Sequence, residues 1–124
     1  MNQSTNIYEQ NLQQGPANYA SLTPISFLER SAAVYPDKIA VIHGDLRFSY
    51  REFYQRCCRL ASALRNHGVG IGDTVSIMAP NVPAMLEAHY GVPMTGAVLN
   101  ALNYRLDADN IRFILEHAQT KILI

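Results

Sequence analysis

Three glycines at alternate positions, Gly68, Gly70 and Gly72, form the first pattern in this chain that could do chemistry. Glycine-rich loops bind phosphate when they follow a strand and open a helix, because the helix N-terminus then points at the anion. Here the order is reversed, since a helical pattern precedes the glycines and a strand pattern follows them. The loop is therefore predicted to turn the chain, with Gly68 ending the helix in a left-handed conformation.

Histidine side chains are the next candidates, because they ligate metals and transfer protons near neutral pH. Four occur, none at metal-ligand spacing: His43, His67, His89 and His117. His67 and His117 lie near predicted helix ends, where a positive charge suits the helix dipole. His89 shares a predicted helix face with Met85 and Val92, which is typical of a histidine in a core or an interface. No metal site and no catalytic histidine is predicted.

The two cysteines, Cys57 and Cys58, are adjacent and cannot form a disulfide framework. On a helix they point about 100° apart, which places Cys57 on the apolar face and Cys58 near its edge. They are predicted to be small buried apolar residues and not a redox pair. Free cysteines indicate a reducing, intracellular setting, so we expect a cytoplasmic protein.

Asn103, Tyr104 and Arg105 follow a predicted strand and could reach a ligand, because α/β folds place their sites at the carboxyl ends of strands. A role in stabilising the loop is the alternative, and we favour it. Asp107 and Asp109 are most simply a helix cap and a first-turn charge.

The composition excludes several classes of function. Lys+Arg and Asp+Glu both number 10, and only two lysines occur, so no basic patch indicates nucleic acid or an anionic membrane. No apolar stretch approaches the ~18 residues that span a bilayer. Residues 1–22 read as a polar arm without the pattern of a secretory signal. Charged residues make up only 16% of the chain, as expected when part of the surface meets more protein.

The first predicted helix begins with Thr23 as its cap and Pro24 in its first turn, and it ends near Tyr35. Its spacing predicts an inner face made of Phe27, Leu28, Ser31 and Val34.

A hairpin follows, with strands at 38–43 and 46–49 joined by a turn at Gly44 and Asp45. Ser49 to Glu52 then matches a capping box that starts a helix running to about His67. The apolar positions of this helix predict one buried face, made of Phe53, Cys57, Leu60, Ala61 and Leu64.

A strand is predicted at 74–79, after which Asn81 is expected to cap a helix that Pro93 ends. The inner face of that helix is predicted to be Met85, Leu86, His89 and Val92. A further strand is predicted at 97–102.

Asp107 is expected to cap the last helix, with an inner face made of Ala108, Ile111, Leu115 and Ala118. The final residues, 121–124, read as a strand. Alternating strands and helices of this kind predict an α/β fold with parallel strands. An apolar terminal strand is typical of the interior of a sheet that is covered on both faces. We therefore expect these 124 residues to be the front portion of a larger α/β enzyme.

Five segments, in order along residues 24–124, resemble motifs of the AMP-forming acyl-CoA synthetases, in the adenylate-forming superfamily that includes luciferase and peptide-synthetase adenylation domains. They are 36–41 (PDKIAV), 48–53 (FSYREF), 68–75 (GVGIGDTV), 81–83 (NVP) and 91–106 (GVPMTGAVLNALNYRL). Phe53 stands where the family has leucine, and Pro93 stands where many relatives have a helix former.

The resemblance implies the N-terminal part of the adenylate-forming large domain: a β-hairpin plus a βαβαβ unit with mainly parallel strands, over residues 23–124. It also implies a ligase that converts a fatty or other simple carboxylic acid to its CoA thioester through an acyl-adenylate. The full-length enzyme would use ATP, Mg²⁺ and CoA, and this chain's partner would be the rest of the polypeptide. The family's phosphate loop, ribose-binding aspartate and C-terminal lysine have no match here. No residue is therefore assigned to catalysis, to a cofactor or to a metal, and the isolated chain is expected to be inactive.

Two alternatives stay open. The chain could be a standalone α/β binding or interaction module without catalysis, which would melt cooperatively as a soluble monomer. It could also be a Rossmann-like nucleotide-binding domain, which ATP or NAD would stabilise against heat.

Overall fold

The computed structural model describes residues 12–124, and its first helix, α1, spans Pro24–Val34. The part of the predicted arm at residues 1–11 lies outside the described residues. Residues 12–22 contain no helix or strand, and they form an exposed turn in which the amide of Asn18 donates to the carbonyl of Gly15 over 3.1 Å.

Helix α1 begins as predicted, with Thr23 as its cap. The Thr23 hydroxyl accepts from the Ser26 amide, and the Ser26 hydroxyl accepts from the Thr23 amide, both over 3.2 Å. Its predicted inner face is wrong in part, because only Leu28 is buried whereas Phe27 and Val34 are each 55% exposed. Among the described residues α1 packs mainly on one helix, so it buries a narrow stripe.

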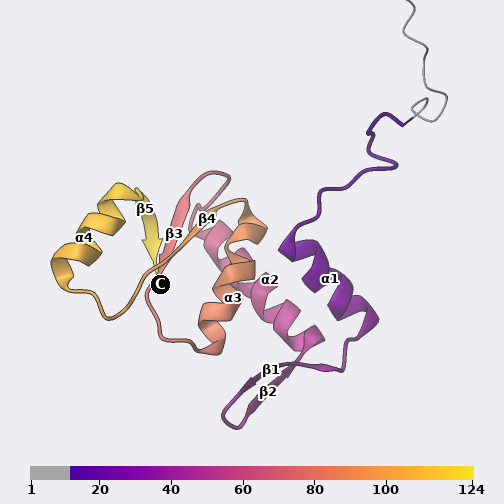
Figure 1. Ribbon diagram of the computed structural model, residues 1–124, viewed down its shortest axis with the longest axis horizontal. Coiled ribbons are helices and arrows are strands. Elements are labelled where there is room, and N and C mark those ends of the chain that lie inside the picture. Colours follow the sequence, from indigo (N-terminus) through magenta and orange to yellow (C-terminus); the bar gives the residue numbers. More distant parts are fainter. Residues whose placement is uncertain (1–11) are drawn as a thin grey trace, which may run out of the picture.

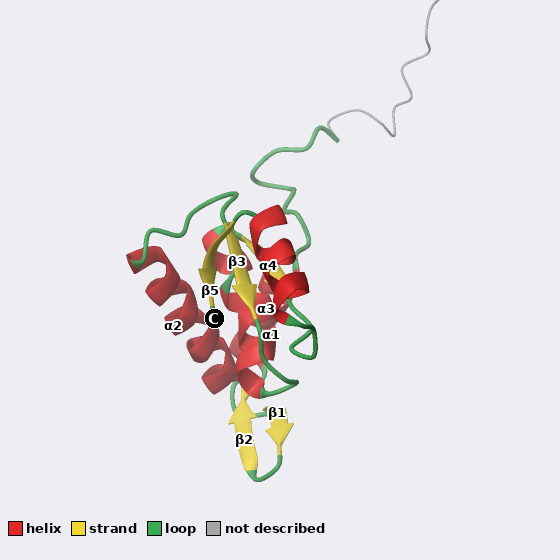
Figure 2. Cartoon of the chain, turned by 90° about the vertical axis from the view of Figure 1, so that its left-hand side faces the viewer, coloured by secondary structure: helices red, strands yellow, loops and turns green. Residues whose placement is uncertain are grey.

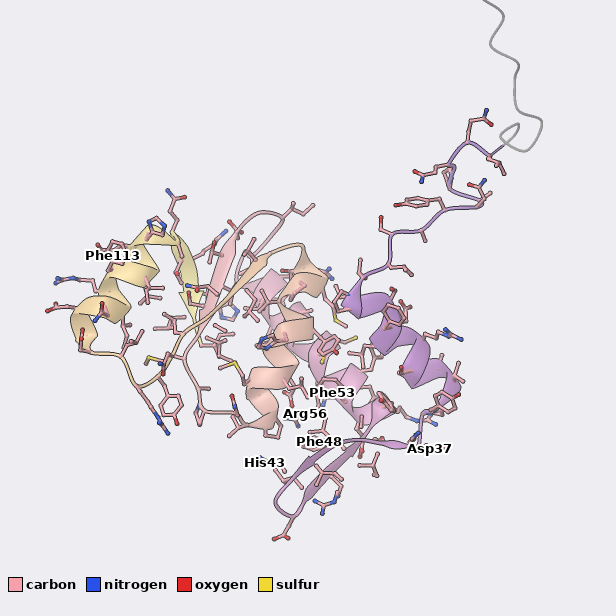
Figure 3. All side chains as sticks on the ribbon, in the orientation of Figure 1. Asp37, His43, Phe48, Phe53, Arg56 and Phe113 are labelled. Atoms are coloured by element: carbon pink, nitrogen blue, oxygen red, sulfur yellow. The ribbon has the colours of Figure 1, made fainter. Side chains whose placement is uncertain are left out.

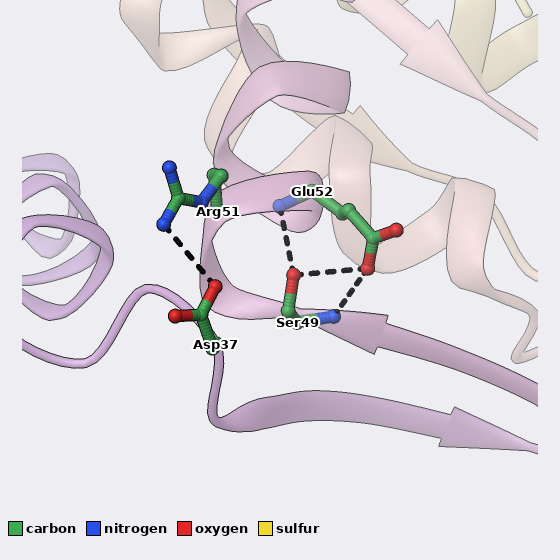
Figure 4. A network of polar contacts seen from close by, with 4 residues as sticks. All are labelled: Asp37, Ser49, Arg51 and Glu52. Carbon is green, nitrogen blue, oxygen red and sulfur yellow. Dashed lines mark hydrogen bonds and ion pairs between the residues drawn. The ribbon is translucent and has the colours of Figure 1, made fainter.

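The hairpin consists of β1 (Ile39–His43) and β2 (Leu46–Ser49), paired antiparallel as predicted. Ser49 then caps α2 (Tyr50–Asn66) in the predicted capping box. The Ser49 amide donates to the Glu52 carboxylate over 2.8 Å, and the Glu52 amide donates to the Ser49 hydroxyl over 3.3 Å (Figure 4). The tight turn from β2 into α2 is thus held by the side chains at the junction.

Four of the predicted inner residues of α2 are buried and Leu60 is partly buried, which confirms this face; the four are Phe53, Cys57, Ala61 and Leu64. The helix ends where Gly68 takes a left-handed φ of 80°, also as predicted.

Three parallel strands form the second sheet: β3 (Thr74–Ile77), β4 (Val98–Ala101) and β5 (Thr120–Leu123). Their order is β4-β3-β5, so β3 is central. The connections are α3 (Pro83–Gly91) with the short 3-10 helix η2 (Pro93–Thr95), and then α4 (Ala108–His117). The predicted α/β fold, a hairpin plus parallel strands alternating with helices, is confirmed.

The helices lie in layers around this sheet. Figure 1 shows α4 on one side of the sheet and α2 and α3 on the other, with α1 beyond α2; Figure 2 shows the hairpin projecting from one end. The main core fills the space between the sheet and the helices α2 and α3. Its buried side chains are Leu64, Val69, Val75, Ile77, Ala88, Val92 and Ala97.

The polar side chains of the sheet join its three strands. The Asn100 amide donates to the Ser76 hydroxyl over 3.0 Å, and the hydroxyls of Ser76 and Thr120 lie 2.7 Å apart. Ser76 is fully buried, so these bonds satisfy a hydroxyl that water does not reach. The three residues form a polar ladder across β4, β3 and β5.

Two predictions for α3 are wrong. Val82, not Asn81, is the N-cap, and no side chain caps the helix. The buried residues within the helix are Glu87, Ala88 and Gly91, whereas Leu86 and His89 are exposed. The predicted face is wrong only in part, because Val92 is fully buried and Met85 packs against the core. Pro93 does end the helix as predicted, because α3 stops at Gly91.

The terminal helix is less buried than predicted, and the terminal strand lies partly exposed at the edge of the sheet. Asp107 caps α4 by accepting from the Asn110 amide over 2.9 Å, as expected. None of its predicted inner residues is buried, since Ala108 is exposed and the rest are half-buried. Strand β5 lies at one edge of the sheet as the structure describes it, and Leu123 is 47% exposed. Residues 12–124 do not cover both faces of β5, and its coverage by further polypeptide stays a prediction.

Candidate functional site

The carboxyl ends of β3, β4 and β5 meet at one edge of the sheet, where α/β folds place ligands. The loop after β4 carries the predicted candidates Asn103, Tyr104 and Arg105, all exposed. The Asn103 side-chain oxygen accepts from the Arg105 amide over 3.0 Å, and the Arg105 guanidinium lies 5.6 Å from the centre of the Tyr104 ring. These contacts stay within the loop, in agreement with the loop-stabilising interpretation.

The glycine loop lies at the opposite, amino end of the strands. Its polar groups are already paired: the Gly70 amide donates to the Asp73 carboxylate over 2.8 Å, and Lys121 donates to Asp73 over 2.8 Å and to the Gly68 carbonyl over 2.7 Å. These partners hold the pKa of Asp73 below its usual value, Lys121 having the larger effect. The Asp73 carboxylate already accepts from the Gly70 amide, which would have to donate to a bound phosphate. This contact favours the interpretation that the loop turns the chain.

The side chains of His67, His89 and His117 make separate local contacts and do not share a partner. His67 Nδ1 is 2.9 Å from the Ala63 carbonyl, His89 Nδ1 is 2.8 Å from the Met85 carbonyl, and the His117 ring stacks on Phe113. His89 is exposed, so of its two predicted places, a core or an interface, the core is wrong and the interface stays a prediction. Across residues 12–124 no three His, Cys, Asp or Glu side chains gather as metal ligands would.

The cysteines behave as predicted. Cys57 is fully buried and Cys58 is half-buried, and both are free thiols. Burial, with a smaller contribution from Glu87, raises the pKa of the Cys57 thiol to about 12. Full burial and a raised pKa both favour the neutral thiol, as expected for a small apolar residue of the core.

The structure also reveals a pair that sequence reasoning missed. Arg56 of α2 donates through Nε to Glu87 of α3 over 2.5 Å, and its guanidinium lies 4.6 Å from the centre of the Phe48 ring of β2 (Figure 3). The Glu87 side chain is 10% exposed and that of Arg56 38%. The hydrogen bond to Glu87 raises the pKa of Arg56. The pair joins α2 to α3, beside the hairpin. The sequence did contain one signal of this pair, because Glu87 is a charged residue within an otherwise mostly apolar helix.

A groove of about 590 Å³ lies between β1, the start of α1 and α3. Its lining is mostly apolar and consists of Pro24, Val41, Ile42, His43, Asn81, Val82, Pro83, Met85, Leu86, His89 and Tyr90. It brings His43 and His89 to one surface, which their sequence positions did not predict. We call this hollow the β1–α3 groove.

No helix within residues 12–124 has the length and hydropathy needed to cross a membrane. The described residues form a parallel sheet with helices on both sides and a hairpin (Figure 1).

Comparisons with known proteins agree with this fold. The family model for AMP-binding enzymes matches residues 28–124. The acetate/butyrate–CoA ligase AAE7, peroxisomal, of Arabidopsis thaliana is 53% identical over 109 residues, 88% of this chain and 19% of that protein. The acetate–CoA ligase CCL3 of Humulus lupulus is 51% identical over 107 residues, 86% of this chain and 19% of that protein. The chain thus spans about a fifth of the length of the curated relatives that it matches.

Solved structures give the same result. The fatty acyl CoA synthetase of Mycobacterium tuberculosis superposes with a TM-score of 0.76 at 30% identity, over 79% of this chain and 20% of that one. The N-terminal subdomain of NpsA from Klebsiella oxytoca, in complex with anthranilyl-AMSN, superposes with a TM-score of 0.74 at 26% identity, over 79% and 26%. With the family model covering residues 28 to 124 and the fold in agreement, this chain belongs to the AMP-binding enzyme family.

Proposed function

We propose that this chain is the N-terminal portion of an AMP-forming acyl-CoA ligase, with residues 23–124 forming part of the N-terminal subdomain. One observation carries the proposal: proteins more than half identical to it, over 86 to 88% of its length, are CoA ligases for carboxylic acids. Because they extend far beyond the matched region, the activity is proposed for the complete polypeptide and not for these 124 residues.

The proposed reaction has two steps. A carboxylate oxygen attacks the α-phosphorus of ATP, and pyrophosphate leaves to give an acyl-adenylate. The thiol of CoA then attacks the acyl carbon, and AMP leaves with the former carboxylate oxygen. Charge develops on phosphate oxygens in the first step, so the reaction requires cationic groups and Mg²⁺ near them.

The described residues do not fit ATP or Mg²⁺. The loop amide of Gly70 is paired with Asp73, and no metal-ligating cluster occurs within residues 12–124. No step of the reaction is therefore assigned to a residue of this chain. Its proposed contribution is the sheet and its covering helices, on which the rest of the enzyme is built.

For the substrate we propose a fatty or other simple carboxylic acid. The relatives support this range, because their names give acetate, butyrate and benzoate as substrates. The complete polypeptide should be incubated with ATP, Mg²⁺, CoA and each of acetate, butyrate, hexanoate and benzoate. We expect AMP and an acyl-CoA in equal amounts, and acid-dependent exchange of pyrophosphate into ATP when CoA is omitted.

Formation of ADP in place of AMP, or the lack of any acid-dependent exchange, would contradict the proposal. The isolated chain of residues 1–124 serves as the control and should catalyse no exchange.

We also propose a cytoplasmic location, supported by the two free cysteines in α2. A fluorescent fusion of the complete polypeptide should be diffuse in the cytoplasm. Coincidence with a peroxisomal marker would instead place it with relatives such as AAE7, whose name describes it as peroxisomal.

A further inference from the structure

We draw no further inference here: the strongest candidate, the β1–α3 groove between the hairpin, the start of α1 and α3, is an apolar surface, and nothing in the structure of residues 12–124 shows what covers it.

Discussion

Among single residues, the pair that does most for local structure is Ser49 and Glu52. Their three hydrogen bonds lie within four residues, at the point where the chain leaves a strand and enters a helix. Asp37 and Arg51 add an exposed ion pair of 3.1 Å beside it (Figure 4). The exposed ion pair contributes little, because water screens it, whereas the cap satisfies backbone amides that have no helical partner.

Replacing the cap tests this account. Ser49→Ala should lower the free energy of unfolding by about 1 kcal/mol, because the Glu52 amide loses its acceptor. Denaturant unfolding measures the change. Ser62→Ala, at an exposed position inside α2, is the control and should be neutral or slightly stabilising, since alanine favours helix. An equal loss in both variants would show that the cap does not act as described.

The same cap predicts a pH dependence. Hydrogen bonds from the Ser49 amide and then from its hydroxyl lower the pKa of Glu52 from its ordinary value of 4.5. Because the folded-state pKa is depressed, the contribution is present above the ordinary value and is lost as pH falls through the folded value. Wild type should therefore be more stable than Glu52→Gln near pH 7, and unfolding curves between pH 7 and pH 3 should show this difference shrinking. A constant difference would contradict the assignment.

Between elements, α2 and α3 approach each other closely at Gly91. A Cβ at this position would lie 2.9 Å from Leu60 Cδ2 and 3.0 Å from the carbonyl oxygen of Cys57. The backbones can approach this closely only because Gly91 has no side chain. A turn away, the Arg56–Glu87 pair joins the same two helices, so small size and charge together set their separation.

Gly91→Ala should therefore destabilise the fold by about 1–3 kcal/mol, although alanine is the better helix former, because the Cys57 carbonyl cannot move without shifting α2. Thermal unfolding measures it. Gly70→Ala is the matched control, since its added Cβ would meet nothing closer than an Asp73 oxygen at 4.0 Å and its φ is not positive. We expect it to be near neutral, and a comparable loss there would refute the steric explanation.

These contacts also mark the limit of what the sequence predicts. Caps and breakers act within a few residues, so Thr23, Ser49 and Gly68 located their helix ends correctly. The face of α3 depends on a partner 31 residues away, Arg56, which allows Glu87 to be buried. The β1–α3 groove depends on how the hairpin lies against α3, and no local pattern encodes that arrangement. We assigned no catalytic residue because the family's catalytic motifs have no match in this chain, and that assignment stays a prediction.

In the whole molecule, α2 contributes buried side chains to both apolar clusters. Phe53 and Cys57 near its start pack with Leu28 of α1, and Leu64 near its end packs with Val75 and Ile77 of the sheet. One continuous helix thus crosses from the hairpin to the sheet, so the two clusters should not unfold separately.

Cavities at the two ends of α2 test this coupling. Leu64→Ala should cost about 2–5 kcal/mol and Phe53→Ala about 3–5 kcal/mol. Each should shift one common transition, followed both by tyrosine fluorescence and by helix circular dichroism. Ile71→Ala, at a side chain 92% exposed, should change stability by less than about 0.5 kcal/mol. Two separate transitions, or a silent Leu64→Ala, would show that α2 does not connect the clusters.

The polar ladder of Ser76, Asn100 and Thr120 limits how the connections between the three strands can change in evolution. Sliding β4 by a single position along β3 would bring Leu99 or Ala101 opposite Ser76 in place of Asn100, and sliding β5 would move Thr120 away from the Ser76 hydroxyl. Either shift would remove a hydrogen bond from a hydroxyl that water does not reach. Insertions and deletions around α3 and α4 are therefore tolerated only when the loops absorb them and the alignment of the strands is kept. Homologous chains should vary in loop length there while retaining hydrogen-bonding groups at these three positions.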